Sequence, residues 1–207
     1  MSSDSFSQGF KGLCPISYFV VRRIGRFTGI LHQWSSSRIF LVQSRVYAIN
    51  LLFATVVLIC MMNFLKNSQD PVLSKKYQLR AGVGLSANQI GLNKRMFTAY
   101  FVDEAGRQHE YVLANPEIIS HSVWMIYLPQ GEGCLSVDRE VKGFVPRYEW
   151  IKVKGFDPEG EKVTLKLKGY ASIVIQHEID HLNGIMFYDR MNKKNPFLVP
   201  ENCRSLF

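Results

Sequence analysis

Between residues 5 and 69 the chain has neither aspartate nor glutamate. The first 69 residues carry seven basic side chains and one acidic one, whereas residues 70–207 carry 18 basic and 16 acidic side chains. The formal net charge of +8 therefore belongs mainly to the first third of the chain, and the rest has the charge balance of an ordinary soluble domain. Because a nucleic-acid site needs a basic patch, we predict no direct nucleic-acid site in the nearly neutral part.

Cysteine is also scarce, and its spacing excludes a disulfide framework. The four cysteines lie far apart, without paired spacing, in a chain long enough to bury a sizeable core. We interpret them as unpaired thiols in a reducing compartment. The sequence has no repeat or low-complexity tract, and 47% hydrophobic with 13% aromatic residues excludes a disordered chain. The cysteines are Cys14, Cys60, Cys134 and Cys203.

Residues 1–60 form a basic, nearly acid-free leader whose composition is typical of an organellar transit peptide and equally of arbitrary coding sequence. Within it begins a 17-residue apolar run at 46–62, which is at the short end of the roughly 17 to 25 residues that span a bilayer. A secretory signal would be shorter and nearer the start. Three interpretations stay open: a marginal membrane anchor, a buried helix of the domain, or a segment without selected function.

Residues 61–207 have the pattern of one catalytic domain. Strands are predicted at 96–102 and 110–113, and a β-hairpin at 148–156 and 161–168, where apolar and polar residues alternate in the second arm. The apolar stretch 171–182 has the length of a helix and is followed by Asn-Gly, a common stop signal. These elements predict an α+β fold, with mixed or antiparallel sheets packed around a central helix.

That helix carries the sequence His-Glu-Ile-Asp-His at 177–181. At about 100° per residue, His177 and His181 lie about 40° apart on one helix face, close enough to bind one metal ion, with Glu178 beside them to handle a proton of water. Asp180 also points to the buried side, so it needs a cationic partner, for which Arg147 is the candidate. An accidental match on a surface helix would not explain four ionisable side chains in an otherwise apolar segment.

A hydrolytic metal site needs a third protein ligand and one open position. Glu201 lies at the separation that a zinc peptidase would use, although it follows Pro200 and is close to the C-terminus. Cys134 stands between small or flexible residues that would let its sulfur reach a metal, but a lone cysteine is more often a small buried apolar residue. The residues alone leave both candidates open.

Three segments, in this order, resemble the signature motifs of the peptide deformylase family: GVGLSANQ at 82–89, EGCLS at 132–136 and QHEIDH at 176–181. The similarity runs from about residue 61 to residue 198 and is closest to the class found in Gram-positive bacteria. The resemblance implies a metal-dependent hydrolase that removes the formyl group from the N-terminal formyl-methionine of nascent chains. A zinc-dependent metallopeptidase and a non-functional or membrane-tethered relative are the alternatives.

The resemblance also implies a role for each matching residue. The catalytic groups would be Glu178 as general acid/base, with the side-chain amide of Gln89 and the backbone N–H of Leu135 facing the formyl oxygen. Backbone at the glycine-rich loops would pair with the extended substrate. The metal ligands would be Cys134, His177 and His181, and the substrate-binding residues Val83, Gly84 and Gly133.

The resemblance favours ferrous iron as the metal, with zinc, nickel or cobalt able to replace it, and a thiolate ligand such as Cys134 would make the site sensitive to oxygen. It implies a bacterial cytoplasmic enzyme working close to ribosomes, while the leader keeps an organelle or a membrane contact through 46–62 open.

The sequence departs from the family pattern in two places. Ser86 replaces a small apolar residue, and the sequence before residue 61 does not resemble the polar segment and helix with which the family begins.

Overall fold

The computed structural model describes residues 39–207, with side chains from residue 52 onward, and divides the chain into two compact units, Met1–Leu79 and Arg80–Phe207. Predictions for residues 1–38, including the start of the leader and Cys14, lie outside the described residues. The domain boundary near residue 60 stays a prediction. The described helices of the first unit are α3 (Ile39–Gln69) and α4 (Pro71–Tyr77).

Helix α3 contains the whole apolar run at 46–62. It ends before Asp70, whose side chain caps α4 by accepting from the backbone N–H groups of Val72 and Leu73. The chain breaks between the two helices at Asp70-Pro71, because aspartate at the N-cap and proline in the first turn start a new helix. Residues Leu52–Gln69 are long and apolar enough to cross a membrane, a criterion that core helices of soluble proteins also meet.

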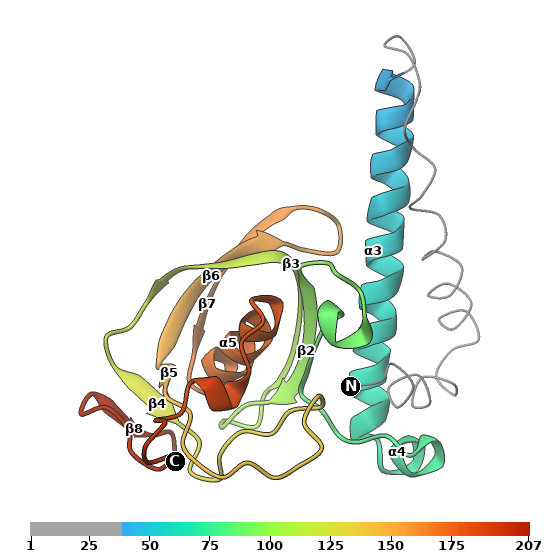
Figure 1. The fold of residues 1–207 in the computed structure, drawn as a ribbon. Helices are drawn as coiled ribbons and strands as arrows, with labels where there is room; N and C mark the ends of the chain where they lie inside the picture. The colour runs from blue at the N-terminus through green and yellow to red at the C-terminus, as the bar shows by residue number, and fades with distance from the viewer. Residues whose placement is uncertain (1–38) are drawn as a thin grey trace. The chain divides into compact units, whose positions relative to one another are not determined.

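The second unit contains two sheets and one central helix (Figure 1). The larger sheet has the order β1-β2-β3-β6-β7 with every neighbouring pair antiparallel, and the smaller has the order β5-β4-β8 with β4 and β8 parallel. The α+β fold class is confirmed. The elements are β1 (Gly84–Ser86), η2 (Ala87–Ile90), β2 (Met96–Val102), β3 (Gln108–His121), β4 (Met125–Tyr127), β5 (Arg147–Tyr148), β6 (Trp150–Phe156), β7 (Lys162–Lys168), α5 (Tyr170–Leu182), η3 (Phe187–Asp189) and β8 (Cys203–Ser205).

Two hairpins form the larger sheet as the alternation pattern predicts. Strand β2 matches the predicted range, and β6 with β7 forms the predicted hairpin. Strand β3, however, runs on to His121, well past the predicted end at residue 113. The backbone accommodates Pro116 because Asn115 has a φ of 50° and the pairing with β6 shifts register between Ala114 and Glu117, so the strand continues through a bulge.

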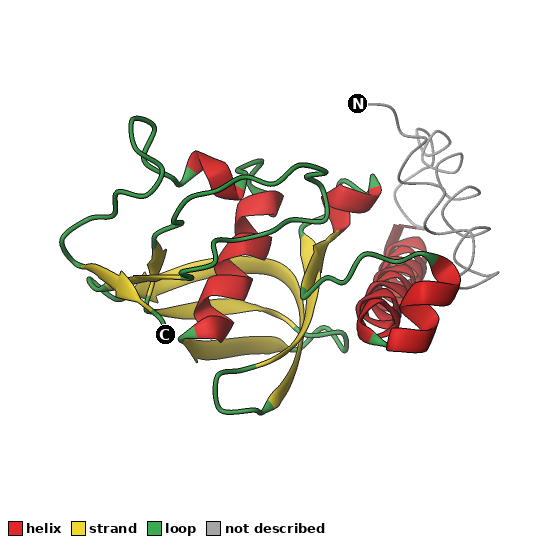
Figure 2. Cartoon of the chain, turned by 90° about the horizontal axis from the view of Figure 1, so that it is seen from below, coloured by secondary structure: helices red, strands yellow, loops and turns green. Residues whose placement is uncertain are grey.

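Helix α5 lies across one face of the larger sheet (Figure 2). Its apolar residues Val174, Ile175 and Ile179 pack into the main core with side chains from β2, β3, β6 and β7. It ends at Leu182, where Asn183 is the C-cap and Gly184 has a φ of 72°, which confirms the predicted stop. A helix buried between sheets in this way gives a rigid support for the ionisable side chains that it carries.

Candidate metal centre

The two histidines of α5 face each other across one helical turn. The Nε2 atoms of His177 and His181 lie 3.1 Å apart, as the spacing of four residues predicts. The Sγ atom of Cys134, from the loop between β4 and β5, lies 3.1 Å from Nε2 of His181. The structure therefore brings together the three residues that were predicted as metal ligands, and their ligand atoms all lie within 4.8 Å of one another.

The two distances of 3.1 Å are slightly shorter than those expected between donors around a single small ion. Donors placed about 2.0–2.3 Å from a tetrahedral metal lie about 3.3–3.8 Å from one another. One thiolate and two imidazoles supply three protein donors and leave further coordination positions for water or substrate. Burial raises the pKa of Cys134, but hydrogen bonds from His177 and His181 outweigh it and lower the pKa to about 6, so the thiolate form that metals bind is favoured at neutral pH.

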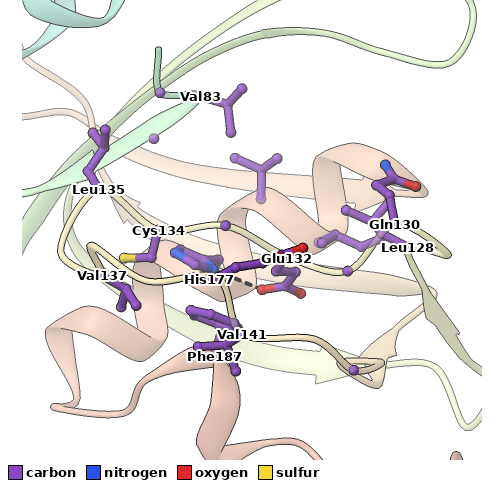
Figure 3. A pocket seen from close by; sticks show the side chains of 18 of the residues that line it. Val83, Leu128, Gln130, Glu132, Cys134, Leu135, Val137, Val141, His177 and Phe187 are labelled. Atoms are coloured by element: carbon purple, nitrogen blue, oxygen red, sulfur yellow. Dashed lines mark hydrogen bonds and ion pairs between the residues drawn. The ribbon is translucent and has the colours of Figure 1, made fainter. Parts of the chain in front are cut away.

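Glu132 orients one of the predicted ligands, a role that the sequence did not reveal. Its Oε2 atom lies 2.9 Å from Nδ1 of His177 (Figure 3), so this carboxylate accepts the Nδ1–H and leaves Nε2 free for a metal. Burial raises the pKa of Glu132, yet the charge and hydrogen bonds of Arg147, together with those of His177, lower it to about 2. Glu132 therefore stays ionised and can hold the imidazole in one orientation.

A network of buried charges supports Glu132. Arg147 is 2% exposed and donates from Nε and one terminal nitrogen to the two Glu132 oxygens, each at 2.8 Å, and from its other terminal nitrogen to Asp180 at 2.5 Å. The prediction that Arg147 partners Asp180 is confirmed. Arg190 also donates to both Asp180 oxygens. Arg147 thus links helix α5 to the loop between β4 and β5, which carries Glu132 and Cys134.

Replacing Arg147 with methionine should lower the free energy of unfolding by about 3–5 kcal/mol, because it leaves two buried carboxylates without their shared cation. Arg190→Met is the matched control. The Arg190 side chain is 46% exposed, so its loss should cost much less. Urea unfolding of the metal-free proteins measures both, and equal losses in the two variants would contradict a special role for Arg147.

Glu178 lies beside the ligands and is 2% exposed. Burial is the largest influence on its pKa and raises it, although the neighbouring histidines and a hydrogen bond from Ser86 act in the opposite direction. A carboxyl whose pKa is raised from its usual value suits proton transfer near neutral pH. Gly84 must lack a side chain here, because a Cβ atom would lie 2.1 Å from Oε1 of Glu178.

Gln89 is held in a defined orientation next to the cysteine loop. Its Oε1 accepts the backbone N–H of Ser86 at 2.8 Å, while its Nε2 donates to Oγ of Ser136 at 2.9 Å and lies 3.7 Å from Sγ of Cys134. The amide nitrogen is therefore turned toward the thiol.

Leu135 follows Cys134 and packs so closely against Gly82 that a Cβ atom on this glycine would lie 2.7 Å from the leucine side chain.

A pocket of about 740 Å³ opens over these groups, which is large enough for several residues of a peptide (Figure 3). Its walls combine glycine-rich backbone with apolar side chains such as Val141, Ile173 and Phe187. Cys134, His177 and Glu178 all reach it. The pocket is also lined by the other predicted substrate-contacting residues: Val83, Gly84, Gln89, Gly133 and Leu135.

Glu201, the alternative third ligand, is placed differently. It is exposed in the segment that precedes β8 and is not among the described residues whose ligand atoms converge. The ligand set of a thermolysin-like peptidase is therefore not assembled by the described part of the chain. Its place after Pro200, where no helix forms, is the physical reason.

A mixed cysteine-histidine donor set with a buried glutamate beside it, on a helix that packs against an antiparallel sheet, is typical of a metallohydrolase centre. The family model for Polypeptide deformylase matches residues 44–197. The chain belongs to this family.

Curated relatives and solved structures agree with that assignment. Peptide deformylase 2 of Bacillus subtilis is 56% identical over 143 residues, which cover 69% of this chain and 78% of the relative. The peptide deformylase of Oceanobacillus iheyensis is 56% identical over 142 residues, covering 69% and 78%. The crystal structure of peptide deformylase from Thermus thermophilus matches with a TM-score of 0.56 at 37% identity, covering 68% of this chain and 74% of that one.

These matches confirm the resemblance to the Gram-positive class and the fold, and they do not favour the peptidase alternative. The chain is a metal-dependent hydrolase that removes the N-terminal formyl group from nascent peptides. The family match begins at residue 44, within α3 and before the residue near 61 at which the motifs become recognisable.

Proposed function

We propose that Cys134, His177 and His181 hold one divalent metal ion, and that Glu178 is the general acid/base for hydrolysis of the formyl group on N-terminal methionine. The observation that carries this proposal is the convergence of the three ligand atoms within 4.8 Å, next to a buried carboxylate in a pocket. When bound, the ion acts as a Lewis acid that lowers the pKa of water and polarises the formyl group.

The protein groups divide the remaining chemistry among them. Glu178 takes a proton from the attacking water and returns it to the amine that leaves, which its position beside the ligands and its raised pKa both favour. The Nε2–H of Gln89 and the backbone N–H of Leu135 donate to the formyl oxygen as its negative charge develops. Because Gln89 is already fixed by Ser86 and Ser136, it needs no reorientation during the reaction.

The substrate lies in the pocket as an extended strand. Backbone groups at Val83, Gly84 and Gly133 pair with it, since these residues line the pocket and the two glycines keep side chains out of the way. The apolar wall near Val141, Ile173 and Phe187 suits a methionine side chain. We propose that the substrates are formyl-methionyl chains as they leave the ribosome, in the cytoplasm.

The proposed native metal is ferrous iron, with zinc, nickel or cobalt as replacements. A ligand set with two imidazoles and one thiolate accepts any of these ions, so the donor chemistry does not single out one. Iron would make the thiolate of Cys134 vulnerable to oxidation, and activity should then decline in air faster than with nickel or zinc.

The test is the set of products formed from a formyl-methionyl tripeptide under oxygen-free conditions. We expect formate and a tripeptide with a free amino group, and an acetyl-methionyl tripeptide should stay intact. Cleavage of an internal peptide bond would instead support the metallopeptidase alternative, and no product from a metal-loaded chain would refute both.

A further inference from the structure

Ser86 touches the proposed general acid/base directly. It is the last residue of β1, it is 0% exposed, and its hydroxyl Oγ lies 2.7 Å from Oε2 of Glu178 and 3.0 Å from the backbone oxygen of the same residue. One hydroxyl has one proton to donate, and the shorter distance together with the negative charge favours the carboxylate. Strand β1 thus holds the carboxylate of α5 from a residue 92 positions away.

The two oxygens of Glu178 are consequently not equivalent. Oε2 is bound by Ser86, whereas Oε1 lies against the backbone of Gly84, a residue that lines the pocket. The terminal torsion of a glutamate is broad, so the carboxylate plane is not fixed by the rotamer alone. The bond from Ser86 restrains this torsion by holding Oε2.

Ser86 has a second task in the capping box with which η2 begins. Its backbone N–H donates to Oε1 of Gln89, and any residue except proline would do the same. Only the side chain reaches Glu178. The sequence resemblance places a small apolar residue at this position in most members of the family, so the hydroxyl is a departure that adds one donor to the carboxylate.

We propose that Ser86 is a positioning residue, which acts through Glu178 by fixing the orientation of its carboxylate for proton transfer. The inference rests on the proposed role of Glu178. A purely structural role would require only that the buried hydroxyl find an acceptor, and the backbone oxygen of Glu178 at 3.0 Å would satisfy that need. The short bond to Oε2 has a different consequence, because it constrains the group that moves the proton.

The test compares Ser86→Ala with the wild-type chain, both loaded with nickel, on a formyl-methionyl tripeptide. Since the lost hydrogen bond is to a charged group, we expect kcat to fall about tenfold, with KM within about twofold and one metal ion per chain. Ser86→Thr keeps the hydroxyl and should retain a kcat well above that of Ser86→Ala.

Ser122→Ala is the matched control. Ser122 is 5% exposed, and its hydroxyl donates to the backbone oxygen of Trp124 and accepts the backbone N–H of Trp150, away from the pocket. We expect a comparable loss of melting temperature in Ser122→Ala and Ser86→Ala, but a reduced kcat only in the latter.

Three results would overturn the inference: an unchanged kcat in Ser86→Ala, an equal loss of kcat in Ser122→Ala, or a threonine variant no better than alanine. Failure of the proposed function would give a different result: the wild-type chain would bind nickel and release no formate. That result would remove the positioning role as well.

Discussion

Glu178→Ala should lower kcat for formate release by a factor of about 10²–10⁴ while the metal stays bound. The loss is large because general acid/base catalysis contributes a factor of this size. Glu132, the nearest acidic group in the cluster of ion pairs, already accepts hydrogen bonds from Arg147 and His177 and has a pKa of about 2, so it cannot substitute as a base near neutral pH.

Metal content measured with kcat separates this role from ligation. Glu178→Ala is expected to contain one ion per chain, because Cys134, His177 and His181 are unchanged and none of them depends on the Glu178 carboxylate. Glu201→Ala is the control for removal of an acidic side chain, since Glu201 is exposed and lies outside the group of converging ligands. Equal rates in wild type and Glu178→Ala would refute the assignment of the general acid/base.

Cys134→Ala should abolish stoichiometric metal binding. The variant keeps two imidazoles, but it loses the only thiolate among the converging ligands of the described residues. We expect the dissociation constant of the metal to rise by more than about 100-fold, which exceeds the usual effect of losing a residue that only hydrogen-bonds to a ligand. Isothermal titration calorimetry of the metal-free proteins with zinc or nickel measures the change in the dissociation constant.

Cys203→Ala provides the matched control for removal of a thiol. Cys203 lies in β8, and burial raises its pKa to about 11, so it is a protonated thiol at neutral pH. In Cys134 the neighbouring histidines lower the pKa to about 6. The Cys203 variant should bind metal like the wild type. A Cys134→Ala protein that still bound one ion tightly would require another third ligand, and Glu201→Ala would then be the next variant to examine.

The sequence predicted best those features that depend on local spacing. The four-residue separation of His177 and His181 sets their approach on one turn of α5, and alternation in β7 sets which side chains of the hairpin are buried. The partnership of Arg147 with Asp180 is an exception among contacts between distant segments, because a general rule predicted it: a buried carboxylate needs a cation. The resemblance, rather than the spacing, selected Cys134 over Glu201.

Contacts between distant segments were not predictable in the same way. It was not predicted from the sequence that the carboxylate of Glu132 would meet Nδ1 of His177, 45 residues later. Ser86 stood out in the sequence only as a replacement for a small apolar residue, yet its hydroxyl binds Glu178. A signal did exist for Glu132, since it is an acidic residue two positions before a candidate ligand cysteine, and ligating histidines usually donate their second ring N–H to a carboxylate.

The excess positive charge of the chain has a definite place in the structure. It belongs to the segment before residue 70, whose described part is α3, whereas the unit that carries the pocket is close to neutral. The three interpretations of the run at 46–62 remain hypotheses. Membrane fractionation of the full chain distinguishes the anchor from the other two, because an anchored chain would sediment with membranes.

We expect one metal ion, held by Cys134, His177 and His181, to make this chain an active deformylase. The most direct test of this claim is the initial rate of formate release from a formyl-methionyl tripeptide, measured while metal-free chain is titrated with ferrous iron in the absence of oxygen. The rate should rise from near zero in proportion to added iron and level off at one ion per chain. A rate that is already maximal without metal, or that stays at zero beyond one equivalent, would contradict the claim.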